Sequence, residues 1–165
     1  MYNALVIAKW FLLKNNAEKK EHESDIEEYE GITHLKLQKL LYYAQGINIA
    51  IYGKPLFNEA ICAWRHGPVV EDVYQVFKPF GSNPIVLNLS EYETNVINSL
   101  DEKTIQVLNL TYDNFAIYTA WQLRNMTHED GTPWDMTVKE NGANSEIPLE
   151  YIETYFKENV VDNGK

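Results

Sequence analysis

The stretch from His34 to Tyr52 constrains the fold most, because its apolar residues face two sides of one helix. Their spacing follows the 3.6-residue period of an α-helix throughout. One stripe consists of Leu37, Leu40, Leu41, Ala44, Ile47 and Ile51, and the roughly opposite side carries Leu35, Tyr42 and Ile49. A helix at a protein surface keeps one polar face. The pattern therefore predicts a mostly buried central helix over about residues 34–52, with Lys36 and Lys39 directed to water.

Local signals set the ends of this helix and the start of the next. Thr33 is placed as an N-cap, and Gly53 followed by Pro55 is a typical stop. Residues 61–64 form a short apolar run, either a strand or an extended segment. Pro68 suits the first position of a following helix, where a missing N–H costs nothing. The buried stripe of that helix would be Val70, Val73, Tyr74 and Phe77.

The rest of the chain predicts further amphipathic helices. Residues 2–14 form the first, and the charged stretch 15–31 is expected to be a loop. Capping boxes at 90–93 and 119–122 open two more helices, with a break in the first near 99–101. Residues 129–134 contain Gly and Pro and predict a turn.

The C-terminal part predicts one loose segment and one last helix. Residues 139–146 are polar, and Pro148 is expected at the first position of a helix over 147–160. An apolar run at 85–89 is a candidate strand partner for residues 61–64. The fold class is therefore mainly α: residues 1–165 form a compact single-domain bundle of six or seven helices around the central one, with at most a small two-stranded ribbon.

Charge and cysteine usage limit the classes of function. The net charge is −10, and the acids gather in 18–30, with seven acids and two lysines, and in 140–165, with six acids and two lysines. No basic cluster exists, so nucleic acid is not an expected partner. A basic protein partner fits better, although acidic tails also keep proteins soluble. With one cysteine, no signal-peptide pattern and no apolar run long enough to span a membrane, we expect a cytoplasmic protein.

Enzymatic and metal sites find little support. A nucleophilic Cys62 would need a base such as His66 or His128, yet Cys62 lies in an apolar run where a buried thiol is ordinary. The same three residues are too few for a structural zinc site, which usually has paired cysteines. No glycine-rich phosphate loop is present. We therefore expect no catalytic residues, no metal and no cofactor.

The sharpest local feature is the turn Trp64-Arg65-His66-Gly67-Pro68. Trp64 would anchor the turn in the core, and Gly67-Pro68 would set the backbone. Arg65 and His66 would project outward, where they could receive an acidic or carbonyl group of a partner. A scaffold role is favoured over partner contact, and His128 is likewise favoured as a polar lock for the following turn. If the two segments meet in space, Arg65, His66, His128 and Trp134 would share one partner-binding surface.

Four segments between residues 33 and 134 resemble the Panacea antitoxin domain family, which includes SocA-type antitoxins and GepA-like prophage proteins. The segments are LQKLLYYAQG, GKPLF, AWRHGPVVEDVY, and Thr127-His128 followed by Pro133-Trp134. Each is unspecific alone, but their order and spacing together are specific. The motif positions are Leu37, Leu41, Tyr43, Trp64, Gly67, Pro68, Val70, Tyr74, Thr127 and Pro133.

The resemblance implies the antitoxin of a type II toxin–antitoxin pair, which neutralises a cognate protein toxin by direct binding. In the SocA-type branch the antitoxin also presents its toxin to a bacterial AAA+ protease. The chain carries no recognisable extra DNA-binding module, which puts autoregulation of its operon in doubt. Two alternatives stay open: a prophage accessory or host-interaction protein of the same fold, and a small hydrolase or metal-dependent enzyme.

Overall fold

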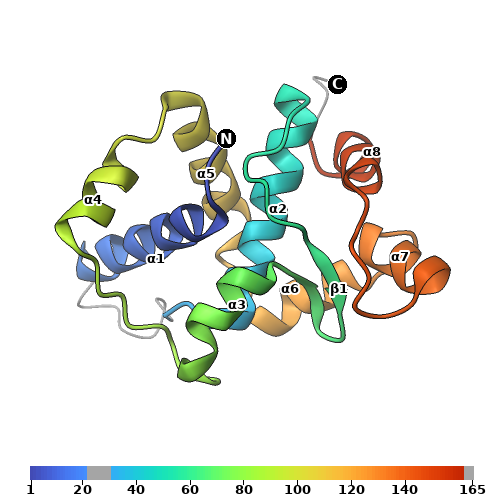
Figure 1. Cartoon of the computed structure of the whole chain (residues 1–165), viewed down its shortest axis with the longest axis horizontal. Helices are drawn as coiled ribbons and strands as arrows, with labels where there is room; N and C mark the ends of the chain where they lie inside the picture. The colour runs from blue at the N-terminus through green and yellow to red at the C-terminus, as the bar shows by residue number, and fades with distance from the viewer. Residues whose placement is uncertain (22–30, 162–165) are drawn as a thin grey trace.

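The computed structural model describes residues 1–21 and 31–161 (Figure 1). Its described part is mainly helical and contains one short antiparallel hairpin, which confirms the expected fold class. The elements are α1 (Ala4–Glu21), α2 (His34–Tyr52), β1 (Cys62–Trp64), β2 (Gly67–Val69), α3 (Glu71–Phe77), the 3-10 turn η1 (Lys78–Phe80), α4 (Glu91–Asn98), α5 (Glu102–Phe115), α6 (Ala120–Thr127), α7 (Pro133–Asn141) and α8 (Leu149–Asn159). None of the described helices is both long enough and apolar enough to cross a membrane.

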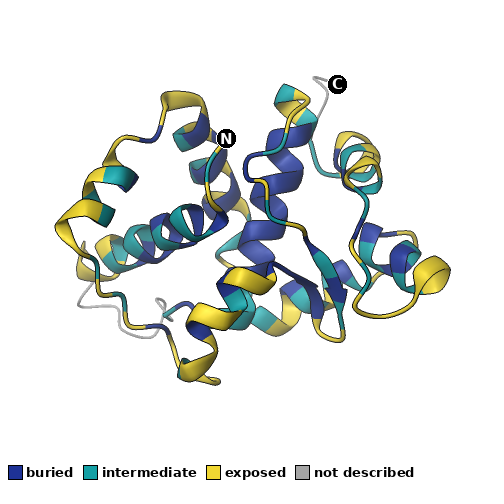
Figure 2. Cartoon of the chain, viewed as in Figure 1, coloured by how far each residue is buried: buried dark blue, intermediate teal, exposed yellow. Residues whose placement is uncertain are grey.

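Helix α2 runs through the centre of the molecule, as its two-sided apolar pattern predicts. Every residue from Leu37 to Ile49 is buried, and Figure 2 shows the helix dark blue along most of its length. Helices α1, α3, α5, α6 and α8 and strand β2 all pack against it. Gly46 lies against α8, and an added Cβ there would be 2.4 Å from the Phe156 ring. A larger residue at position 46 would therefore push α8 away from the core.

The two lysines expected to face water do not do so. Lys39 is 0% exposed, because the hairpin and α6 cover its side of α2, and its Nζ donates a hydrogen bond to the carbonyl of Pro68 at 3.2 Å. Lys36 is half-buried and its Nζ donates to the carbonyl of Ala116. The prediction was wrong because the positions of residues around one helix do not show which other elements will cover its polar side.

The hairpin replaces the predicted start of the third helix. Strands β1 and β2 pair with Cys62 opposite Val69 and Trp64 opposite Gly67, which leaves Arg65 and His66 as the two-residue turn. Gly67 has φ 111°, a conformation that favours glycine. Pro68 therefore lies in a strand, and α3 begins only at Glu71.

The expected pairing of 61–64 with 85–89 is also wrong. The amide of Ile85 donates instead to the carbonyl of Ile32. The second neighbour of β1 is the segment 144–147, where Ala63 N donates to Ser145 O at 2.8 Å and Asn144 N to Ala63 O at 2.7 Å. Residues 139–146 are thus not loose, because their first part belongs to α7 and the rest is bonded to β1.

Three expected boundaries shift. The loop expected at 15–31 is helical up to Glu21, where buried Asn15 donates from its side-chain amide to the Tyr112 hydroxyl at 3.1 Å; residues 22–30 lie outside the described residues. The turn expected at 129–134 ends earlier, because Thr132 caps α7 and Pro133 is already helical. Pro148 is the N-cap of α8 rather than its first residue.

The predicted capping signals are present. Thr33 Oγ1 accepts from the amide of Lys36, and Gly53 ends α2 with φ 68°. Both capping boxes form, Ser90 with Glu93 at α4 and Thr119 with Gln122 at α6. The break near residues 99–101 separates α4 from α5, which Asp101 caps. These signals depend only on neighbouring residues, which is why sequence alone identifies them.

Candidate partner-binding site

The hairpin turn and the α6–α7 junction meet in space. His128 ends α6, and its Nε2 lies 3.0 Å from the carbonyl oxygen of Arg65. The indole N–H of Trp134, on the first turn of α7, donates to the carbonyl of Trp64 at 2.7 Å. The rings of His128 and Trp134 lie against each other, with centroids 3.7 Å apart. Two segments that are 63 to 70 residues apart in sequence thus form one unit.

His128 is the link between the two segments. Its Nδ1 lies 2.8 Å from the carbonyl of Arg124, so both ring nitrogens face carbonyl oxygens. A neutral imidazole has one N–H and can donate to only one of them, whereas the imidazolium donates to both. Burial lowers the pKa of His128, and the two carbonyl contacts oppose that effect. The polar contacts of the ring thus join the hairpin turn to α6, and only its ring contact with Trp134 reaches the segment 129–134 that it was expected to lock.

Lys39 lies directly beneath the hairpin. A Cβ at Gly67 would be 2.6 Å from Lys39 Cε and 2.9 Å from the hydroxyl of Thr127. Burial, and secondly the charge of Arg124, lowers the pKa of Lys39 to about 7. Glycine at position 67 is therefore required both for its φ and for the space that Lys39 and Thr127 occupy.

Two buried glutamines join the segments that resemble the family. Gln38 accepts from the amide of Val70 at 2.8 Å and donates to its carbonyl at 3.3 Å. Gln45 accepts from the amide of Leu56 at 2.7 Å and donates to the carbonyl of Phe57 at 2.9 Å. The side chains of LQKLLYYAQG thus satisfy the backbone of GKPLF and of the hairpin exit. Sequence reasoning missed both, although a polar amide inside an apolar helix is a usable signal.

The remaining motif residues stabilise the same region. Leu37 and Leu41 are 0% exposed, and Tyr43 stacks on Phe115 with ring centroids 3.9 Å apart. Tyr74 lies edge-on against Trp64, with ring centroids 4.9 Å apart. Thr127 donates from its hydroxyl to Arg124 O, and Thr132 donates to Thr127 O, each at 2.7 Å. Pro133 is buried at the start of α7. These residues have a packing role.

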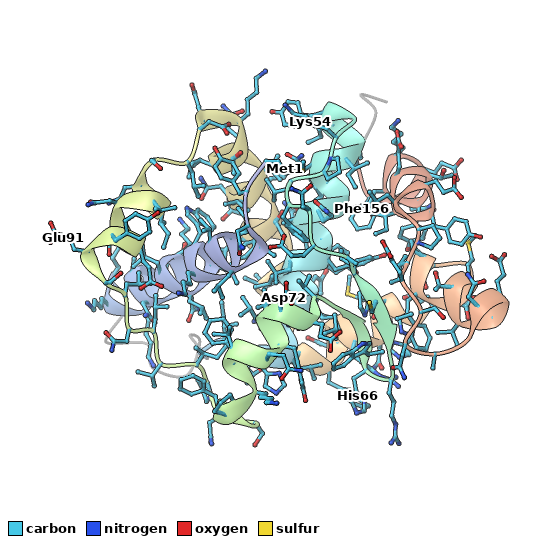
Figure 3. The ribbon with its side chains drawn as sticks, in the orientation of Figure 1. Met1, Lys54, His66, Asp72, Glu91 and Phe156 are labelled. Carbon is cyan, nitrogen blue, oxygen red and sulfur yellow. The ribbon has the colours of Figure 1, made fainter. Side chains whose placement is uncertain are left out.

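Side chains available to a partner lie around this unit. Arg65 and His66 are exposed at the turn, and Figure 3 shows His66 at the edge of the molecule opposite Lys54. Arg124 lies over the ring of Trp121, with its guanidinium carbon 4.8 Å from the centroid. Trp121 is 57% exposed. Sequence reasoning did not single out Trp121 or Arg124, although Arg124 and Arg65 are the two arginines of the chain.

Catalytic and metal chemistry gain no support from this region. Cys62 is half-buried in β1, and burial raises the pKa of its thiol, which reduces the thiolate fraction at neutral pH. Across residues 1–21 and 31–161, no group of three or more His, Cys, Asp or Glu side chains is arranged to hold a metal ion.

Comparison with known proteins identifies relatives over the same stretch of the chain. A family model described as "Antitoxin SocA-like, Panacea domain" matches residues 37–135, which span α2, the hairpin and the α6–α7 junction. The chain is 30% identical over 133 residues to the protein named Antitoxin SocA of Caulobacter vibrioides strain NA1000 / CB15N, covering 77% of this chain and 71% of that protein. No solved structure matches the chain.

Proposed function

Because the chain belongs to the SocA-like antitoxin family with a Panacea domain, we propose that it neutralises a cognate protein toxin by binding it directly. The observation that supports this most is the joining of the Arg65–His66 turn to the α6–α7 junction through His128 and Trp134. This arrangement holds exposed side chains on a rigid base. Rigid presentation favours binding because little conformational entropy is lost on association.

The charge of the chain bears on the kind of toxin. A net charge of −10 produces a field that attracts a basic protein and accelerates its approach. We infer a toxin with a basic surface. Delivery of that toxin to a AAA+ protease stays a prediction from the family resemblance.

The test is co-expression with the protein encoded by the adjacent open reading frame. We expect that protein alone to stop growth, and co-expression of this chain to restore growth and yield a complex that co-purifies. Growth restored without a complex would point to an indirect mechanism, and failure to restore growth would contradict the proposed function. A chain with Gly67→Ala, which disturbs the hairpin, serves as the matched loss-of-structure control.

A further inference from the structure

We propose that one face of the molecule, the α6–hairpin surface, docks a carboxylate-bearing segment of the partner. The surface consists of Arg65, His66, Trp121, Arg124, His128 and Trp134. Contacts connect its members: Arg124 lies on Trp121, His128 contacts the Arg124 carbonyl and the Trp134 ring, and its Nε2 faces the Arg65 carbonyl. The inference rests on the proposed function, because it takes the toxin as the partner.

The composition of this surface is opposite to that of the whole chain. Both arginines of the protein lie on it, together with two of the four tryptophans and two of the four histidines. The chain as a whole carries 24 acids against 14 lysines and arginines. Trp and Arg are the residues most enriched among those that dominate binding energy at protein interfaces. A local cluster of this kind in an acidic chain is typical of a contact surface.

The arginines have no acidic partner among the described residues. The salt bridges found there use Lys9, Lys14, Lys139 and Lys157. Arg124 donates from Nη1 to the Asn125 side chain, but its Nε is buried without a hydrogen-bond partner. The side chain as a whole is half-exposed, and a carboxylate matches a guanidinium with charge-assisted hydrogen bonds. The partner that fits this surface therefore brings an aspartate or glutamate to Arg124.

The interior beneath the surface strengthens its preference for an anion. Lys39 lies under the hairpin, and its charge acts on His34 and His128, while Arg124 acts on Lys39. The charges that act on Lys39, His34 and His128 are thus cationic, whereas Glu71 and Glu146 act on Cys62 in β1. A carboxylate placed on Arg124 would lower the repulsion among the cationic groups. Lys39 itself stays covered and contributes through its field when it is protonated.

Nucleic acid would also present anionic groups, but it fits less well. Binding to a phosphate backbone requires many basic groups along a track, and two arginines in a chain of net charge −10 do not supply one. A basic toxin can still carry a single acidic segment. The field of the whole chain acts at long range, whereas the arginines decide the contact itself.

Charge reversal on the full chain tests the inference, with the adjacent-gene protein as the probe. Arg65→Glu and Arg124→Glu are compared with Lys54→Glu, an exposed lysine at the opposite edge of the molecule (Figure 3). Affinity is measured by titration calorimetry. We expect each arginine variant to weaken binding about tenfold or more, and Lys54→Glu to change affinity less than about twofold. Melting curves identify any variant that does not fold. If Arg124→Glu does not fold, Arg65→Glu, which lies at the exposed turn, remains as the test.

The remaining outcomes decide the inference separately from the proposed function. Wild-type affinity in both arginine variants would overturn the docking surface and leave the antitoxin proposal intact. Three other results would also overturn it. The Glu variants could bind the toxin more tightly, or they could abolish a dimer of this chain while toxin binding persists. Nucleic acid could also co-purify with the wild-type chain and be lost only in the arginine variants. If the wild-type chain itself binds no toxin, the proposed function fails first. A charge swap would identify the carboxylate. An Asp or Glu of the toxin is changed to Lys, and binding restored between that toxin variant and the Arg124→Glu chain marks the contacting acid.

Discussion

The side-chain amide of Gln38 makes two hydrogen bonds to the backbone of Val70, accepting from its N–H at 2.8 Å and donating to its carbonyl at 3.3 Å. Gln38 lies on the central helix and is 2% exposed, and Val70 is the residue that connects β2 to α3. This pair attaches the hairpin to the core. It places the turn residues relative to α2 before any partner arrives.

Replacing Gln38 by leucine is expected to destabilise the protein by about 1–3 kcal/mol, because the N–H of Val70 stays buried and unpaired, whereas its C=O keeps the hydrogen bond from the amide of Tyr74. The measurement is urea unfolding followed by far-UV circular dichroism. Gln106→Leu is the matched control, since Gln106 is exposed and its one contact, to Glu102, is 3.5 Å long; we expect a change within about 0.5 kcal/mol. Equal effects of the two substitutions would show that the Gln38 pair does not matter for stability.

Alanine at Gly67 is expected to cost about 2–4 kcal/mol, from backbone strain at φ 111° and from overlap with Lys39 and Thr127. Gly53→Ala separates the two causes. Gly53 also has a positive φ, of 68°, but nothing lies within 4 Å of an added Cβ, so only strain of about 1 kcal/mol is expected. Thermal unfolding of both variants measures the difference, and a similar loss in each would contradict the close contact at Gly67.

The stability of the protein is expected to rise with pH between 7 and 9 because of Lys39. Its pKa is lowered from 10.5 to about 7 by burial, so in this range the unfolded chain binds a proton that the folded chain does not. With ~1.4 kcal/mol per proton and pH unit, and a proton difference that rises from about one half at pH 7 to nearly one above pH 8, the free energy of unfolding should increase by about 2 kcal/mol from pH 7 to 9. Urea unfolding at several pH values measures this slope.

Two lysine variants serve as controls for the dependence of stability on pH. Lys39→Met should flatten the slope, whereas Lys103→Met, at an exposed position, should leave it unchanged. The lowered pKa values of His34 and His128 affect stability mainly below their ordinary value of 6.5, and the raised pKa of Cys62 affects it only near or above 9.0, so the slope is read from the middle of the range. A slope that persists in Lys39→Met would assign the pH dependence to other groups.

Toxin binding is expected to take up protons near pH 7. A carboxylate on Arg124 raises the pKa of Lys39, which is about 7 in the free chain, and also that of His128. Titration calorimetry in buffers of different ionisation enthalpy counts the protons. We expect net uptake in the wild-type chain and a smaller value in Lys39→Met, with proton release in the wild type as the contradicting result.

Sequence alone predicted the parts of the fold that depend on neighbouring residues. The capping box of Ser90 and Glu93, and the two-sided apolar pattern of α2, are of this kind. The start of α7 was missed even though Thr132, Pro133 and Asp135 form a local cap, because glycine and proline within 129–134 also indicate a turn. There the local signal was present and was outweighed by composition.

Long-range pairing could not be predicted in the same way. Nothing in residues 61–64 shows that they pair with 67–69 on one side and with 144–147 on the other. The burial of Lys39 depends on that hairpin, so one wrong pairing also made the lysine appear exposed. The sequence predicts four residues of the candidate site: Arg65, His66, His128 and Trp134. It did not single out Trp121 and Arg124, which the structure places in contact with each other on α6.

Hydrogen–deuterium exchange of the chain, free and bound to the adjacent-gene protein, tests the central claim most directly. If the toxin docks on the α6–hairpin surface, binding should slow exchange in residues 62–69 and 120–134 and leave α4 unchanged. The Arg124→Glu variant should lose that protection at matched concentrations. Protection confined to α4 and the first turns of α5, or a complex that slows exchange nowhere in the two segments, would contradict the account.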